Sequence, residues 1–171
     1  SENGRNFEFM GEDPCLAGVM VAHYVRGVQS AGVMATLKHF VCNNDEHRRY
    51  SCDCIVGERA LHEIYTPAFK SGIDAGAGAV MTSYNLVNGE WAGQSKFVIT
   101  DLLRGELGFK GMVMTDWGSI KDTAKFLTSG NDLCMPRCSP QNIQAALDGG
   151  RATEADLDRM IVQWLSEIGR A

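Results

Sequence analysis

The sequence predicts an α/β fold that forms about half of a TIM-type (β/α)8 barrel. Short, continuously apolar segments alternate with helical patterns, which is typical of parallel strands covered by helices. Four strands are expected, at 33–37, 79–83, 111–115 and 132–135, whereas a complete barrel has eight. Polar residues follow several of these strands, and barrel enzymes place their functional groups at such carboxyl ends.

A doubly wound parallel sheet is the alternative architecture. It also binds ligands at the carboxyl ends of its strands, but near a single switch point of the sheet. Contributions from three or four strands favour the barrel. Because half a barrel leaves two open sheet edges and an uncovered interior, we expect another segment, in the same or another chain, to complete it.

The first helix is expected over residues 12–30. Asp13 takes the N-cap position and Pro14 lies in the first turn, where its missing N–H leaves no helical bond unmade. The strand 33–37 follows and leads into Lys38 and His39. The buried face of the helix is predicted from apolar residues at every fourth position: Leu16, Met20, Tyr24 and Val28.

The middle of the chain continues the same alternation. A polar loop at 42–54 precedes a helix over 58–76, and the strand 79–83 then leads into Tyr84. The Asn-Gly pair at 88–89 predicts a tight turn.

The strand 111–115 follows a helix over 96–108 and delivers Asp116 to its tip. An Asp at such a corner often caps the next helix. Ser119 lies closer to the helical pattern of 119–129 and is the better candidate for that cap, which leaves Asp116 free for chemistry.

Two helices close the chain. Ser139 is expected to cap a helix over 139–150, and Thr153 forms a capping box with Asp156 for a helix over 153–170. The buried stripe of this last helix is predicted from its apolar residues: Leu157, Met160, Ile161, Trp164, Leu165 and Ile168.

Composition and charge argue against several classes of protein. The 171 residues carry a net charge of -5 and scattered basic side chains, which disfavours a nucleic-acid partner. No run of about 18 apolar residues occurs, so no membrane-spanning helix is expected. The six cysteines match no strong zinc pattern, so we expect free thiols, which fit a cytoplasmic protein, and neither a metal nor a cofactor.

The polar residues at the strand tips predict a site for an uncharged, polyhydroxylated ring. Asp116 is a candidate nucleophile, base or metal ligand. Lys38 and His39 place adjacent donors at one tip, and Trp117 offers a rigid apolar face that suits the C–H surface of a sugar. Further donors are expected from three other side chains: Arg5, Arg49 and Tyr84.

Six segments of the chain resemble, in order, the N-terminal barrel domain of family 3 glycoside hydrolases of the β-glucosidase type. They are GRNFEFMGEDPCLAG, GVMATLKHFVCNNDEHRR, ERALHEIYTPAFKSGI, VMTSYNLVNGE, ITDLLRGELGFKGMVMTDWG and SGNDLCMP. The resemblance covers essentially all of the chain and implies a retaining exo-β-glycosidase. It assigns Asp116 as the nucleophile that forms a covalent glycosyl-enzyme. It assigns substrate binding to Arg5, Lys38, His39, Arg49, Tyr84 and Trp117.

The resemblance also implies missing parts. Residues 1–171 correspond to the C-terminal portion of the barrel domain, with no second domain. In the family, an α/β sandwich domain supplies the general-acid Glu. The expected partners are therefore a β-glucoside substrate, that domain and the rest of the barrel. Without the acid, protonation of the leaving group is lost, which commonly costs about 10²–10⁴-fold in rate.

Several alternatives stay open. A β-xylosidase of the same family is one, although Trp117 favours a glucosidase; KHFVCNN in place of KHFPG argues against the β-N-acetylglucosaminidase branch. A non-catalytic sugar-binding or inactive fragment is another. A Schiff-base aldolase using Lys38 is the rival from a different class, but no phosphate-binding Gly-rich loop is evident.

Overall fold

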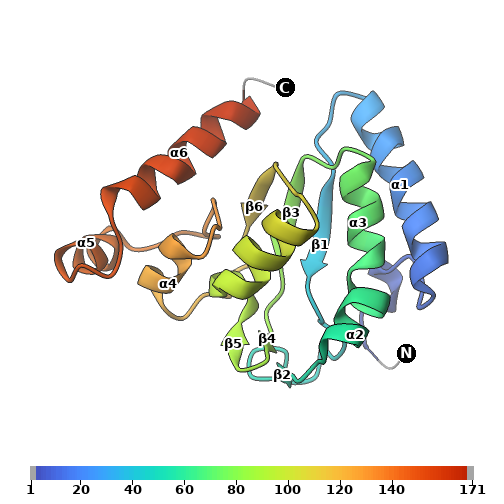
Figure 1. Ribbon diagram of the computed structural model, residues 1–171, viewed down its shortest axis with the longest axis horizontal. Coiled ribbons are helices and arrows are strands. Elements are labelled where there is room, and N and C mark those ends of the chain that lie inside the picture. Colours follow the sequence, from blue (N-terminus) through green and yellow to red (C-terminus); the bar gives the residue numbers. More distant parts are fainter. Residues whose placement is uncertain (1–2, 169–171) are drawn as a thin grey trace.

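The computed structural model describes residues 3–168, and its centre is a three-stranded parallel sheet. The strands are β1 (Thr36–Phe40), β3 (Ala79–Thr82) and β6 (Met112–Met114), in the order β1-β3-β6. Helices lie beside this sheet, and α1 and α3 run next to each other along the β1 side (Figure 1). The arrangement confirms the predicted α/β class.

The register brings the starts of the three strands to the same level. Thr36 pairs with Ala79, and Ala79 pairs with Met112. The strands approach closely because position 111 has no side chain: a Cβ on Gly111 would lie 2.2 Å from the carbonyl oxygen of Gly78. Since all three strands run in the same direction from this line, their carboxyl ends also lie side by side.

The first strand lies later in the chain than the predicted span 33–37. Lys38 and His39 are therefore inside β1 and do not follow it. Burial alternates at the start of the strand, where Leu37 is buried against α3 (Pro67–Asp74). A Cβ on Gly72 of α3 would come within 2.8 Å of the Leu37 side chain. The residues of β1 that pair with β3 are therefore those whose alternate side chains pack on α3, and they begin later than the apolar run 33–37.

The strands predicted at 79–83 and 111–115 are confirmed, but the strand predicted at 132–135 is reduced to a single bridge. Leu133 pairs in parallel with Met114. Met135 then donates its N–H to Thr115 Oγ1 at 2.8 Å, and its carbonyl accepts from the N–H of Gly118 at 2.7 Å. The segment therefore leaves the sheet to support the loop after β6.

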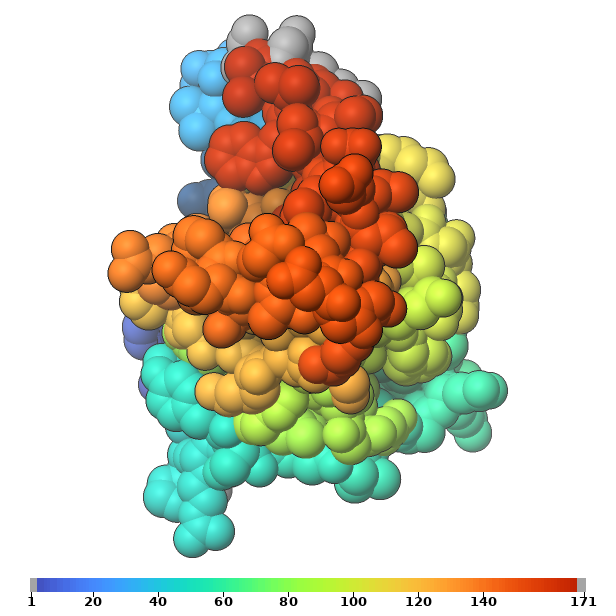
Figure 2. Space-filling model, turned by 90° about the vertical axis from the view of Figure 1, so that its left-hand side faces the viewer, coloured from blue at the N-terminus to red at the C-terminus, as the bar shows by residue number. Residues whose placement is uncertain are grey.

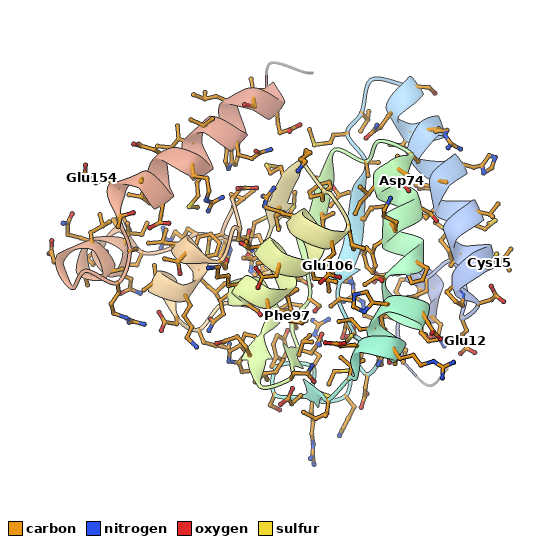
Figure 3. All side chains as sticks on the ribbon, in the orientation of Figure 1. Glu12, Cys15, Asp74, Phe97, Glu106 and Glu154 are labelled. Atoms are coloured by element: carbon orange, nitrogen blue, oxygen red, sulfur yellow. The ribbon has the colours of Figure 1, made fainter. Side chains whose placement is uncertain are left out.

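The helix α1 (Pro14–Ser30) begins as predicted, because the Asp13 side chain accepts from the N–H of Leu16 at 2.8 Å. Its buried face is not the predicted one. Ala17, Gly18 and Val25 are buried, and Figure 3 shows Cys15 at the outer margin of the molecule. Three of the residues predicted to be buried are exposed, and only Val28 packs against the core: Leu16, Met20 and Tyr24 are the exposed ones.

Small residues explain this rotation of α1. A Cβ on Gly18 would lie 2.7 Å from Ser71 Oγ of α3, so the two helices approach through small side chains. Leu16, Met20 and Tyr24 then fall on the opposite side of the helix.

The helix predicted over 58–76 is divided into three parts. It consists of α2 (Glu58–Ala60), a π-helical turn (Leu61–Tyr65) and α3. Pro67 begins α3 and has no N–H, while the N–H of Thr66 bonds to the carbonyl of Leu61 at 3.0 Å. The helix predicted over 96–108 is also π-helical, at Phe97–Glu106.

The last three helices are α4 (Thr123–Thr128), α5 (Pro140–Asp148) and α6 (Glu154–Ile168), and α5 and α6 cover much of the face seen in Figure 2. The predicted Ser139 cap is confirmed, and Thr153 and Asp156 form the predicted capping box. The expected helix at 119–129 is shorter, and Asp122, not Ser119, is its cap: its carboxylate accepts from two backbone N–H groups.

The predicted buried stripe of α6 is only partly correct. Leu157 and Met160 pack against the cluster around Phe126. A polar side chain on the same helix, Arg159, donates to Asp132 and to the carbonyl of Asn131, both at 2.8 Å. Because α6 is fastened along this one edge, the other residues of the stripe stay exposed: Ile161, Trp164, Leu165 and Ile168.

A second, smaller sheet lies beyond the end of β1 (Figure 1). It contains β2 (Asp53–Cys54), β4 (Leu86–Val87) and β5 (Glu90–Trp91), with β4 and β5 joined by the predicted turn at 88–89, whose residues both have positive φ. Short 3-10 turns occur at two further places: Asn6–Glu8 and Ala92–Gln94. No helix within residues 3–168 has the length and apolarity needed to cross a membrane.

Asp132 ties the end of the chain to β6. Its carboxylate is fully buried and accepts from the N–H of Val113 at 2.8 Å, from Arg104 at 2.6 Å and from Arg159 at 2.8 Å. A buried carboxylate is tolerated only when it is paired and hydrogen-bonded in this way. It therefore joins β6, the helix Phe97–Glu106 and α6 at one point.

We expect Asp132→Ala to lower the free energy of unfolding by about 3 kcal/mol, because two partly buried guanidinium groups lose their carboxylate. Chemical denaturation followed by circular dichroism measures this change. The control is Asp101→Ala at an exposed position, which should stay within about 0.5 kcal/mol of the parent protein. Equal effects of the two substitutions would contradict the role of Asp132.

Candidate active site

Asp116 lies two residues beyond the end of β6, where the carboxyl ends of the strands meet. Its Oδ1 accepts from the N–H of Trp117 at 2.7 Å. Its Oδ2 is buried, and no donor among residues 3–168 forms a hydrogen bond with it. A buried carboxylate oxygen without a donor is unusual and suggests a site that a ligand completes.

His39 is the nearest basic group to that oxygen. Its Nε2 lies 3.4 Å from Asp116 Oδ2, and its side chain is buried. Burial is the strongest influence on His39 and lowers its pKa, although the negative charge of Asp116 acts in the opposite direction. Lys38 and Arg5 add to the lowering through their positive charges. The imidazole beside Asp116 therefore favours its neutral form.

Tyr84 interacts with Asp116, and Arg49 packs over the Tyr84 ring. Burial raises the pKa of Tyr84, and the neighbouring Asp116 carboxylate raises it further, so the phenol keeps its proton. The guanidinium of Arg49 lies 4.4 Å from the centroid of the Tyr84 ring and 5.0 Å from that of Tyr50. The two tyrosine rings meet edge to face, with centroids 4.8 Å apart. Arg49 is thus held by two aromatic rings.

Glu8 joins two of the predicted sugar-binding cations. Its carboxylate accepts from Lys38 Nζ at 2.5 Å and from Arg5 Nε at 2.6 Å. Burial by itself would raise the pKa of Glu8, but the hydrogen bonds and charges of Lys38 and Arg5 outweigh it and lower that pKa. The carboxylate therefore stays charged and fixes both cations.

Glu46 joins the remaining cation to this group. Its Oε2 lies 2.7 Å from Arg49 Nη1, and its Oε1 lies 3.6 Å from Arg5 Nη1. Asn43 also donates to Oε1 at 2.9 Å. The backbone N–H of Glu46 donates to the carbonyl of Asn3 at 3.0 Å. Glu46 therefore connects the N-terminal segment to the loop that follows β1.

The structure brings six of the predicted site residues into one continuous network: Arg5, Lys38, His39, Arg49, Tyr84 and Asp116. Trp117 is 64% exposed, so it is not a core residue, and it contacts the network through its backbone N–H. Sequence reasoning missed Glu8, Glu46 and Tyr50. Each lies within three residues of a predicted arginine, and pairing of opposite charges at that spacing is the signal that could have found the two acids.

No group of three or more His, Cys, Asp or Glu in the described part of the chain is arranged to hold a metal ion. All six cysteines are free thiols.

The fold and the site together define an α/β protein with a cluster of cations, aromatic rings and carboxylates at the carboxyl edge of a parallel sheet. Comparison with known proteins shows which family the chain belongs to. The family model described as the glycosyl hydrolase family 3 N terminal domain matches residues 1–166. The chain belongs to this family and is part of its TIM-like barrel domain.

Named relatives agree with this assignment. The chain is 48% identical over 173 residues to β-glucosidase B of Emericella nidulans, covering 96% of this chain and 20% of that protein. It is 45% identical over 159 residues to an exo-α-(1→6)-L-arabinopyranosidase of Bifidobacterium breve, covering 92% of this chain and 21% of that protein. The chain thus spans about a fifth of the length of these relatives.

A solved structure shares the same arrangement. The β-glucosidase of Kluyveromyces marxianus in complex with glucose matches with a TM-score of 0.93 and 39% identity, over 98% of this chain and 21% of that one. The match confirms that the residues described here fold as part of a larger barrel domain.

The environments of two histidines lead to a titration test. His62 is exposed, and its hydrogen bond to Glu106 at 2.6 Å raises its pKa, whereas burial lowers that of His39 (Figure 3 labels Glu106). The ordinary pKa of histidine is 6.5. As the pH falls, we expect His62 to take up its proton at a pH above 6.5 and His39 at a pH below 6.5. NMR of the protein labelled with ¹³C-histidine measures both, with His39→Gln and His62→Gln variants for assignment.

The lowered pKa of His39 also makes the stability of the fold depend on pH. Between the lowered pKa of His39 and 6.5, the unfolded chain binds the proton more readily than the folded one. His39 therefore reduces stability as the pH falls below 6.5. Protonation of His39 before His62 would contradict this description of the site.

Proposed function

We propose that this chain carries the nucleophile and sugar-binding groups of a retaining exo-β-glycosidase acting on terminal β-D-glucosyl residues. The observation that carries the proposal is the buried Oδ2 of Asp116, which has no hydrogen-bond donor among the described residues. A carboxylate oxygen that is not engaged by a donor stays available for attack on a carbon atom. The several relatives named β-glucosidases support the choice of sugar.

In this mechanism, Asp116 Oδ2 attacks the anomeric carbon while the bond from that carbon to the leaving-group oxygen breaks. The leaving group takes a proton from a general acid, and the sugar becomes an ester of Asp116. Water then attacks the same carbon and gives a proton back to the acid, which releases the sugar with retained configuration. The Trp117 N–H holds Oδ1, so Oδ2 is the attacking atom.

The network around Asp116 supplies donors for the sugar hydroxyls. An ammonium group has three N–H donors and a guanidinium has five, so Lys38, Arg5 and Arg49 keep donors beyond those that Glu8 and Glu46 accept. The ion pairs hold these cations in place before the sugar arrives. His39 and the Tyr84 hydroxyl lie next to the reacting carboxylate, and the exposed Trp117 ring is proposed as the apolar wall.

We place the general acid outside residues 1–171. A general acid needs a raised pKa so that it holds a proton near neutral pH. Lys38 and Arg5 lower the pKa of Glu8, which disfavours it as the acid, and Glu46 already accepts from Arg49 and Asn43. We propose a Glu of the α/β sandwich domain as the acid.

In the full-length protein, Asp116→Ala should lower turnover of an aryl β-glucoside by about 10⁴-fold or more, because no covalent intermediate can form. The matched control is Asp101→Ala, which should keep parental rates. Near-parental turnover by Asp116→Ala would favour the non-catalytic alternative. Because a β-xylosidase of the same family stays open, the assay includes an aryl β-xyloside, and a higher kcat/KM for it would replace the glucosidase assignment with a xylosidase.

A slow substrate tests the covalent step directly. A 2-deoxy-2-fluoro-β-glucoside with a good leaving group should accumulate as an ester, since the fluorine slows hydrolysis of the intermediate. Peptide mass spectrometry is expected to find the label on Asp116. A label on another residue would reject Asp116 as the nucleophile.

A further inference from the structure

Tyr50 is an aromatic residue at the rim of the site that the proposed reaction leaves without a role. It follows Arg49 in the loop after β1, and 54% of it is exposed. Nevertheless its ring is held by neighbouring groups. Its hydroxyl accepts from Arg49 Nη2 at 3.0 Å, the Arg49 guanidinium lies 5.0 Å from its centroid, and its ring meets that of Tyr84 at 70°.

Such a combination of exposure and fixed position is informative. A single exposed aromatic residue needs no special explanation in most surfaces. Here, however, a cation and a second ring keep Tyr50 in one orientation. A ring that is already ordered loses little conformational entropy when a ligand packs against it. The geometry therefore makes Tyr50 suitable for binding.

The neighbours of Tyr50 place it on the open side of the site. Asp116 lies at the inner end, and Tyr84, which is buried, lies beside it. Tyr50 packs against Tyr84 and lies partly in solvent. In the proposed reaction, a terminal sugar with its anomeric carbon at Asp116 lies next to His39. The leaving group must therefore extend outward, past the rim.

We propose that Tyr50 contacts the leaving group and favours leaving groups with a flat apolar face. These are an aryl ring or the C–H face of a second β-linked pyranose, which pack well on an aromatic ring. This inference rests on the proposed function. It adds a residue that selects the bond to be cleaved, in contrast to the residues that bind the terminal sugar.

An alternative role for Tyr50 is to hold Arg49 in place. The two roles differ in what they affect, because Arg49 is proposed to bind the terminal sugar. A positioning role would weaken every ligand that fills the terminal-sugar position. A leaving-group role would leave ligands without a leaving group unaffected.

The test uses Tyr50→Ala and Tyr50→Phe in the full-length enzyme, with Tyr24→Ala on the exposed face of α1 as a matched control. Three quantities are measured: kcat/KM for p-nitrophenyl β-glucoside, kcat/KM for methyl β-glucoside, and inhibition by 1-deoxynojirimycin, which fills only the terminal-sugar position. For Tyr50→Ala we expect kcat/KM for p-nitrophenyl β-glucoside to fall about three- to tenfold, which is the value of one aromatic contact. We expect kcat/KM for methyl β-glucoside and inhibition by 1-deoxynojirimycin to change less than about twofold. Tyr50→Phe should keep most of the aryl activity.

The inference is overturned if Tyr50→Ala leaves the aryl substrate unchanged, or if all three quantities fall together. A failure of the proposed function looks different. In that case the parent protein turns over no β-glycoside, or Asp116→Ala retains turnover, and the role of Tyr50 falls with it. A normal loss in Asp116→Ala together with an unselective Tyr50→Ala rejects the inference about Tyr50 alone.

Discussion

The parallel register of β1, β3 and β6 is the constraint on which the site depends. Thr36, Ala79 and Met112 share one level of the sheet, so residues at similar distances along each strand arrive at one edge. His39 and Asp116 are 77 positions apart in sequence, yet their side chains come within 3.4 Å. A shift in this register would separate them. Gly111 secures the register, because any side chain there would collide with the neighbouring strand.

A second organising feature is the balance of charge at this edge. Three cations gather there, and like charges so close would repel one another without counter-ions. Glu8 and Glu46 separate them and fix their side chains. These carboxylates have accepted hydrogen bonds, whereas Oδ2 of Asp116 has none from the described residues. The site therefore contains two kinds of carboxylate: those that organise the donors, and one that is left for the ligand.

The fold was predictable where local chemistry decides it. The caps at Asp13, Ser139 and Thr153 formed because each side chain satisfies nearby N–H groups within its own turn. Errors arose where distant packing decides. Leu16, Met20 and Tyr24 of α1 point outward because Gly18 meets Ser71, which lies far along the chain. The segment at 132–135 leaves the sheet because Met135 bonds to the loop after β6.

The sequence alone determined the α/β class, the family and the residues that gather at the strand ends, because motifs and periodicity are local properties of the chain. Only the tertiary structure decided their partners. Asp116 Oδ2 lies beside His39 without a hydrogen bond from the described residues, Glu46 links Arg5 to Arg49, and Tyr50 packs against Tyr84. These relations depend on burial and on distances between segments far apart in sequence, and both arise only when the strands align.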